Sequence, residues 1–227
     1  MRRRIVCLFL AALLFLQGCV PFLPAGGKGS EKGRRLILLD AGHGGVDPGA
    51  VAADGVLEKD INLTLTLRLR ELLVFMGYDV LLTRETDVSV HDEDAETIRQ
   101  MKSSDLRNRL KLANAHPNAA FISIHQNNFT DPASNGMCFY YSPNNRKSLS
   151  LADTLRDTLL HSLQPENRRE NKKAESNLFL MTNARNPAIL VECGFLSNPE
   201  EEKKLLTDSY QQQICALLLT GLAKESL

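Results

Sequence analysis

Residues 35–45 read RLILLDAGHGG, and this stretch decides the fold. The apolar run from Leu36 to Leu39, between charged neighbours, is typical of a strand buried within a sheet. The strand stops at a glycine-rich turn that carries His43. In open α/β folds, loops that follow strand ends carry the chemistry, so this turn is the first place to look for a functional site.

Helical patterns follow at intervals along the chain. Apolar residues at helical spacing predict a helix over 59–76 that ends at Gly77, and the spacing predicts two more over 104–115 and 147–163. The last long helix is expected to open at Asn198, with proline in its first turn and acidic residues near its positive end.

Short apolar runs between these helices predict strands. They cover residues 78–83, 119–125, 136–142, 178–181 and 188–192, and the polar stretch 164–176 is expected to be a surface connection. Strands that alternate with helices, several of them apolar on both faces, favour one α/β domain. We expect a single twisted, mostly parallel sheet of about six strands with helices on both faces.

The N-terminus has the pattern of an export signal. Three arginines precede an apolar run over 5–16, which is shorter than the roughly 20 residues of a spanning helix. The following Leu16-Gln17-Gly18-Cys19 is similar to a bacterial lipobox, so we predict a lipoprotein-type signal peptide over 1–19 with Cys19 lipidated. Ordinary cleavage and an uncleaved anchor are the alternatives. All three export the domain, either as a membrane-anchored lipoprotein or secreted to the wall or cortex space.

Composition predicts a tether and a folded domain and gives no sign of nucleic-acid binding. Residues 20–34, rich in Pro, Gly, Lys and Ser, predict a flexible tether before a folded domain over 35–227. The 27 basic and 27 acidic residues balance, which gives no electrostatic reason to expect nucleic-acid binding. The body cysteines, at positions 138, 193 and 215, have no metal-binding spacing and are expected to be buried free thiols.

Four residues at the ends of elements form a candidate metal site. His43, His125 and Glu192 each end a predicted strand, and Glu58 precedes the first long helix. Two histidines and a carboxylate are a ligand set that catalytic zinc uses, with one position left for water. A further carboxylate can then carry protons during hydrolysis. Taken alone, each of these residues also fits a purely structural role, such as a loop hydrogen bond, a helix cap or an ion pair.

Motifs along the chain resemble one known family. In order, these are residues 38–50, 58–63, 82–84, Arg109 with 113–114, FISIHQN at 121–127 and PAILVECGFLSN at 187–198. Together they are similar to the zinc-dependent, AmiC-like N-acetylmuramoyl-L-alanine amidases, and the similarity covers about residues 35–225.

The resemblance implies the reaction and its residues. It implies zinc ligands at His43, Glu58 and His125, with Glu192 as the catalytic acid and base. The implied reaction is hydrolysis of the amide between N-acetylmuramic acid and L-alanine of peptidoglycan. A vegetative wall amidase, a non-catalytic peptidoglycan-binding relative and a zinc peptidase acting within the stem peptide remain alternatives.

Within the family, the chain is most similar to the compact germination-specific spore-cortex amidases of endospore formers. The regions 105–109 and 138–143 carry this similarity, which implies a role in cortex maturation before muramic-δ-lactam formation. The connection 143–177 has room for only one helix and a loop. We therefore expect no helical insert that plugs the active site, and an activator protein is one alternative way to control the activity. The sequence leaves open the roles of Arg84, Arg109, Asn127, the 85–104 loop and the basic residues at 168–173.

Overall fold

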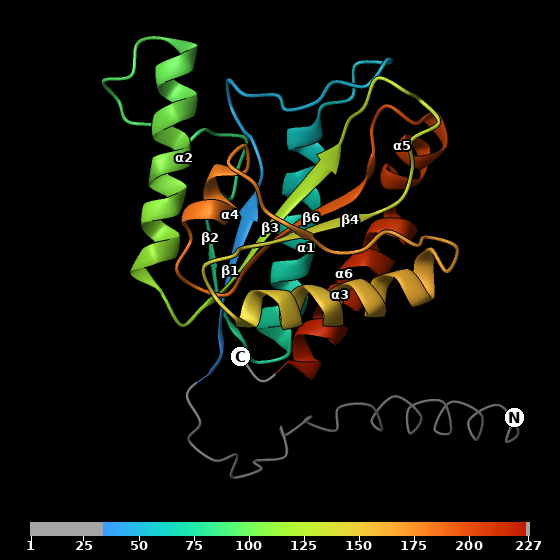
Figure 1. Cartoon of the computed structure of the whole chain (residues 1–227). Coiled ribbons are helices and arrows are strands. Elements are labelled where there is room, and N and C mark those ends of the chain that lie inside the picture. The colour runs from blue at the N-terminus through green and yellow to red at the C-terminus, as the bar shows by residue number, and fades with distance from the viewer. Residues whose placement is uncertain (1–33, 226–227) are drawn as a thin grey trace, which may run out of the picture. The chain divides into compact units, whose positions relative to one another are not determined.

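The computed structural model describes residues 34–225, which form one α/β unit around a six-stranded sheet (Figure 1). The strand order is β2-β1-β3-β6-β4-β5. The strands are β1 (Leu36–Ala41), β2 (Asp79–Leu82), β3 (Ala120–Asn127), β4 (Cys138–Tyr141), β5 (Lys172–Lys173) and β6 (Ala188–Phe195). Strands β2, β1, β3 and β6 are mutually parallel, and β4 runs antiparallel to β6. The predicted α/β class and mostly parallel sheet are confirmed.

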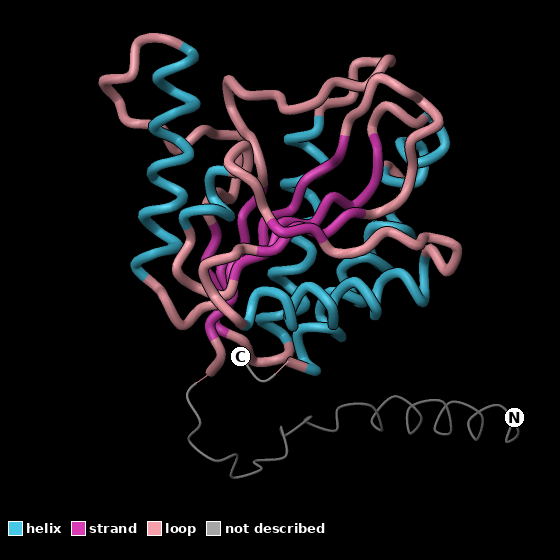
Figure 2. The backbone as a smooth tube through the Cα atoms, in the orientation of Figure 1, coloured by secondary structure: helices cyan, strands magenta, loops and turns pink. Residues whose placement is uncertain are grey.

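Six helices surround the sheet in the described part of the chain (Figure 2). They are α1 (Glu58–Phe75), α2 (Ile98–Ala115), α3 (Lys147–Leu163), α4 (Phe179–Asn183), α5 (Pro199–Leu205) and α6 (Asp208–Lys224). Within residues 34–225, none of them combines the length and the hydropathy that crossing a bilayer requires. The predicted signal peptide, Cys19 and nearly all of the tether lie outside the described residues.

Alternating side chains of the central strands make two separate cores. In β3, Ile122 and Ile124 face one way and pack with apolar residues of α1, α3 and α6. Phe121 faces the other way, and its cluster includes residues of α2 and α4. Helices therefore cover both faces of the sheet, which explains why the central strands read as continuous apolar runs.

Two predictions for residues 164–181 differ from the structure. The run 178–181 was expected to be a strand, and this prediction is wrong, because residues 179–183 form α4. Met181 of this short helix is fully buried in the cluster that includes residues of α2. The sheet edge is instead formed by β5, inside the stretch that was expected to be only a surface connection.

The last long helix is two helices. The backbone N–H and the hydroxyl of Thr207 both donate to the carbonyl of Lys204, which ends α5. A new helix then begins at Asp208. Helix α2 also starts earlier than predicted, at Ile98, where Thr97 and Gln100 form a capping box. The three body cysteines are buried and free, as expected.

The two phenylalanines at the extremes of burial provide a test of this core. Phe121 is fully buried at the sheet centre, whereas Phe75 at the end of α1 is 87% exposed. We expect Phe121→Ala to lower the free energy of unfolding by about 3–5 kcal/mol, because it removes packing and leaves a cavity. Phe75→Ala should change it by less than about 0.5 kcal/mol. Denaturant titration of both variants measures this difference, and equal losses would contradict the assigned core.

Candidate active site

The four predicted site residues come from the same edge of the sheet. His43 follows the end of β1, His125 and Glu192 lie in β3 and β6, and Glu58 is the first residue of α1. His125 and Glu192 are register partners on adjacent parallel strands, so both side chains project from the same face of the sheet. The structure therefore brings together residues that lie up to 149 positions apart in the sequence (192 − 43).

Three of these side chains converge on one point. Nε2 of His43 lies 3.2 Å from Oε2 of Glu58, and Nδ1 of His125 lies 3.0 Å from Oε1 of the same carboxylate. The two imidazole rings are 5.0 Å apart between centroids and nearly perpendicular. One potential ligand atom from each residue lies within 4.8 Å of the other two. This geometry can hold a metal ion between two nitrogens and one oxygen.

Backbone amides and an amide side chain hold the Glu58 carboxylate in place. The backbone N–H of Ala50 donates to Oε2 at 2.8 Å, and that of Gln126 donates to Oε1 at 3.0 Å. Nδ2 of Asn62, one turn along α1, also donates to Oε1. Burial by itself would raise the pKa of Glu58, but the contacts with His125 and His43 outweigh it and hold that pKa well below its usual range. The residue is therefore a carboxylate at neutral pH.

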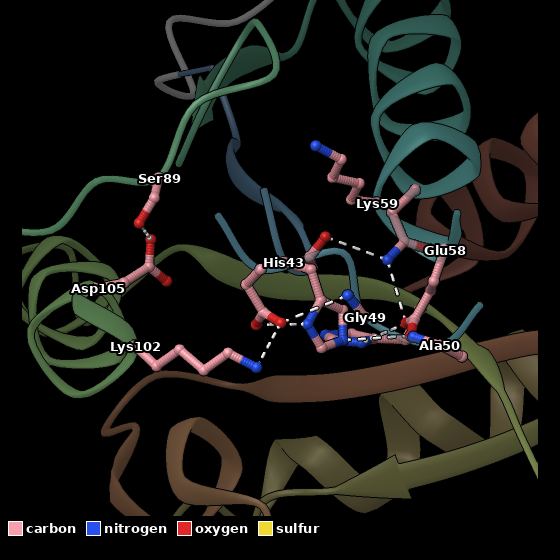
Figure 3. A network of polar contacts seen from close by, with 12 residues as sticks. His43, Gly49, Ala50, Glu58, Lys59, Ser89, Lys102 and Asp105 are labelled. Carbon is pink, nitrogen blue, oxygen red and sulfur yellow. Dashed lines mark hydrogen bonds and ion pairs between the residues drawn. The ribbon is translucent and has the colours of Figure 1, made fainter. Parts of the chain in front are cut away.

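Asp47 orients His43 and was not assigned a role from the sequence. Nδ1 of His43 donates to Oδ2 of Asp47 at 2.7 Å, so Nε2 is the nitrogen that faces Glu58 (Figure 3). A carboxylate on the far nitrogen of a metal-binding histidine fixes its tautomer and ring orientation. Burial disfavours the imidazolium, yet the bonds to Asp47 and Glu58 outweigh it and raise the pKa of His43 to about 9.

The backbone at His43 is held in an unusual conformation by buried arginines. His43 has φ 62°, in the left-handed region that non-glycine residues rarely adopt. Arg109 donates to the carbonyls of Ala41 and His43, each at 2.7 Å, and Arg84 donates to those of Ala41 and Gly42. These contacts give both arginines a structural role, which the sequence had left open.

The charge of Arg109 is balanced inside the protein. Asp40 at the end of β1 accepts from Arg109 at 2.7 Å and from the hydroxyl of Ser123 at 2.6 Å. Asp105 of α2 makes a second ion pair with the guanidinium at 2.6 Å. Burial would raise the pKa of Asp40, but the charge of Arg109 and the hydrogen bonds from Ser123 and Arg109 together outweigh it and lower that pKa. The same Asp105 carboxylate accepts from Ser89 and the N–H of Val90, which ties the 85–97 loop to α2 (Figure 3).

Two glycines make room for the converging side chains. A Cβ at Gly42 would lie 2.2–2.7 Å from ring atoms of His125, and one at Gly49 would lie 2.5 Å from Oε2 of Glu58. Gly49 also has φ +70°, which a side chain would strain. The glycines of the opening motif are therefore required by the close approach of His125 and Glu58 to this loop.

Glu192 faces the same cavity without a bonded partner. The cavity has a volume of about 410 Å³ and lies between the sheet edge, α2 and α4; His43, Glu58, His125 and Glu192 all line it. Oε2 of Glu192 is inaccessible to solvent and has no hydrogen-bond partner. Burial raises the pKa of Glu192 to about 7, since the opposing effect of His125 is smaller. A carboxyl with a solvent-shielded, unpaired oxygen beside a cavity is a common feature of functional sites.

Other candidates lie outside this cavity. Arg168 and Arg169 line a separate depression near the C-terminal end of α3, and Asn177, at the end of the 143–177 connection, is the one residue of that connection that lines the site cavity. His91, His116 and His161 are also absent from its walls. Asn127, for which no role was predicted, does line the cavity.

Comparison with known proteins decides the family. Residues 37–224 match the N-acetylmuramoyl-L-alanine amidase family, which covers most of the chain. The chain belongs to this family. The enzyme class predicted from the sequence, a peptidoglycan amidase, is thereby confirmed.

Two relatives illustrate the similarity. The chain is 34% identical over 190 residues to the germination-specific N-acetylmuramoyl-L-alanine amidase of Bacillus subtilis strain 168, covering 84% of this chain and 79% of that protein. It also matches the structure of the CwlD amidase of Clostridioides difficile in complex with the GerS lipoprotein. That match has a TM-score of 0.80 and 38% identity, over 84% of this chain and 98% of that one.

Replacing the carboxylate that orients His43 tests its role in the site. We expect Asp47→Asn to weaken binding of a divalent cation such as zinc by about 10–100-fold, because the amide no longer enforces the tautomer with Nε2 free. Competition of the amidase with a chromophoric zinc chelator gives the affinity.

The matched control is Asp54→Asn, an aspartate in the same loop whose side chain is exposed, does not line the cavity and accepts from the N–H of Val56. Its affinity for zinc should equal that of the unmodified protein. If Asp47→Asn also left the affinity unchanged, the orienting role of Asp47 would be excluded.

Proposed function

We propose that this amidase is zinc-dependent and hydrolyses the amide bond between N-acetylmuramic acid and L-alanine in peptidoglycan. His43, Glu58 and His125 are the proposed zinc ligands, and Glu192 is the proposed catalytic acid and base. One observation carries the proposal: two imidazole nitrogens and a carboxylate oxygen converge in one cavity, beside a Glu192 carboxyl whose Oε2 is shielded from solvent and unpaired.

The donor set supports zinc over other common cations. Imidazole nitrogens suit zinc, whereas magnesium and calcium prefer oxygen ligands. Three protein ligands leave a coordination position for water or substrate, as catalytic zinc requires. When bound, zinc supplies Lewis-acid polarisation of a carbonyl and lowers the pKa of water. The bond from Asp47 to His43 supports the same assignment, because it leaves Nε2 available as a ligand.

Glu192 has the position for proton transfer. Amide hydrolysis adds one water, so a base must take a proton from that water and an acid must give one to the leaving nitrogen. The Glu192 carboxyl lines the cavity beside its register partner His125 and has no competing bond at Oε2. It takes the proton as the carboxylate and returns it as the acid, which leaves a lactyl carboxylic acid and a free L-alanine amine.

A spore-cortex role is the narrower part of the proposal. It is supported by the similarity to the germination-specific amidase of Bacillus subtilis and to the CwlD amidase of Clostridioides difficile. The proposed role is removal of stem peptides before muramic-δ-lactam forms. The chain also matches the AmiA amidase of Escherichia coli, at 27% identity over 231 residues, so a vegetative wall substrate is the second candidate.

Export and partners complete the proposal. We infer that the protein acts outside the cytoplasm, on peptidoglycan, and that Cys19 is lipidated. An activator protein is supported by one observation, that the similar Clostridioides difficile amidase forms a complex with a lipoprotein. Of the 143–177 connection, only Asn177 lines the site cavity, which supports control from outside the chain rather than by an internal plug.

Digestion of purified peptidoglycan tests the bond that is cleaved. The zinc-loaded protein, incubated with cortex and with vegetative sacculi, should release free stem peptides that begin with L-alanine. Mass spectrometry identifies them. Shortened peptides that remain on the sugar would mean a peptidase, and binding without any product would mean a non-catalytic relative. Faster release from vegetative material would contradict the cortex role.

Two substitutions separate metal binding from proton transfer. Glu192→Gln should keep zinc and lose turnover by about 100-fold or more, because an amide cannot carry the proton. His125→Ala should instead lower the zinc content. Elemental analysis and the rate of peptide release measure the two effects.

Glu200→Gln is the control, since Glu200 is an exposed residue of the first turn of α5. It should retain both zinc and activity. Near-normal turnover by Glu192→Gln would exclude the proposed acid and base role.

A further inference from the structure

Lys102 is the cationic side chain of the cavity that is available to bind an anionic group of a substrate. Two cationic side chains of α2 line the cavity, Lys102 and Arg109. Arg109 is 2% exposed and its nitrogens are bonded to Asp40, Asp105 and backbone carbonyls. The side chain of Lys102 is 47% exposed and its Nζ has a single ion pair, with Oδ1 of Asp47 at 2.7 Å.

The ammonium group retains donors for a ligand. A lysine carries three N–H donors, and the pair with Asp47 uses one of them. Lys59, the other lysine near the glycine-rich loop, contacts the carbonyl of Gly45 and the carboxylate of Asp87 and is buried. Figure 3 shows Lys102 extending from α2 toward the loop of His43, whereas Lys59 lies beside α1.

The ammonium group of Lys102 lies where it can bind a substrate carboxylate that is close to the scissile bond. Asp47 bonds Lys102 through one oxygen and His43 through the other, so one carboxylate group separates the ammonium from a proposed zinc ligand. An extended peptide advances about 3.3–3.6 Å per residue, which puts the second residue of a stem peptide roughly 7 Å from the scissile nitrogen. The free α-carboxylate of the D-glutamyl residue of peptidoglycan lies at that distance.

The charge of the other cavity walls explains why a cation is needed there. Asp47 and Asp105 line the same cavity and would repel an incoming carboxylate. Apolar side chains of Leu106 and Leu178 line it as well and provide no compensating donor. The basic residues Arg168 and Arg169, which could also meet such carboxylates, line a different depression.

We infer that Lys102 is a specificity-determining residue that binds the α-carboxylate on the second residue of the stem peptide. This inference rests on the proposed amidase function and adds a substrate feature to it. The ammonium keeps its bond to Asp47 and uses a remaining donor for the substrate. Peptides in which that carboxylate is converted to a carboxamide should therefore be poorer substrates.

Matched muramoyl tripeptides test the inference. They differ only at the second residue, which carries either a free α-carboxylate or an α-carboxamide. The zinc-loaded protein should have a KM about 3- to 10-fold lower for the carboxylate, the size expected for a partly exposed charge-assisted contact. Lys102→Met should lose this preference through KM, and Lys102→Arg should restore most of it.

A matched control lies on the same helix. Lys111→Met removes an exposed lysine of α2 that does not line the cavity, and it should keep the preference. The zinc content of each variant is measured in parallel. Lower zinc and lower kcat in Lys102→Met with an unchanged preference would overturn the inference, because Lys102 would then act only through Asp47.

The outcomes also separate this inference from the proposed function. If the unmodified protein cleaves both tripeptides equally well, the amidase assignment stands and the role of Lys102 in recognition is overturned. If the protein cleaves neither tripeptide nor intact sacculi, the proposed function itself fails.

Discussion

The buried ion pair between Arg109 and Asp40 is the constraint on which the site depends. Both side chains are shielded from solvent, so removing Arg109 would leave Asp40 as an uncompensated buried charge, at a cost of about 3–5 kcal/mol. The same guanidinium binds the carbonyls on both sides of Gly42 and thereby helps hold His43 in its left-handed conformation. A helix on one face of the sheet thus fixes the loop that carries a proposed metal ligand.

Sheet topology explains why the remaining residues meet this loop. The chain leaves β1 toward β2 on one side and reaches β3 on the other, and the helices α1 and α2 cover opposite faces. Ligand sites of open α/β sheets lie outside the carboxyl ends of strands at such a switch point. His43 and His125 could be predicted for this reason, because each follows or ends an apolar run. Glu58 joins them because α1 begins at this edge.

What the sequence did not reveal depends on contacts between distant segments. Four apolar residues fit a buried strand or a buried helix equally well, and only packing beside α2 makes the 178–181 region helical. Arg84 and Arg109 read as ordinary charges until the carbonyls that they bind are known. Asp47 lies four residues after His43, and that spacing in a loop rather than a helix carries no geometric meaning by itself.

The carboxylates at the cavity differ in whether a cationic side chain is paired with them. Asp40 is paired with Arg109, Asp47 with His43 and Lys102, and Glu58 with two imidazoles. Glu192 has no ion pair within residues 34–225, and burial favours its protonated form. A carboxyl held by a fixed cation cannot readily exchange protons at neutral pH, whereas an unpaired one can. Because Glu192 has no ion-pair partner, it is better suited than the paired carboxylates to carry protons during the proposed hydrolysis.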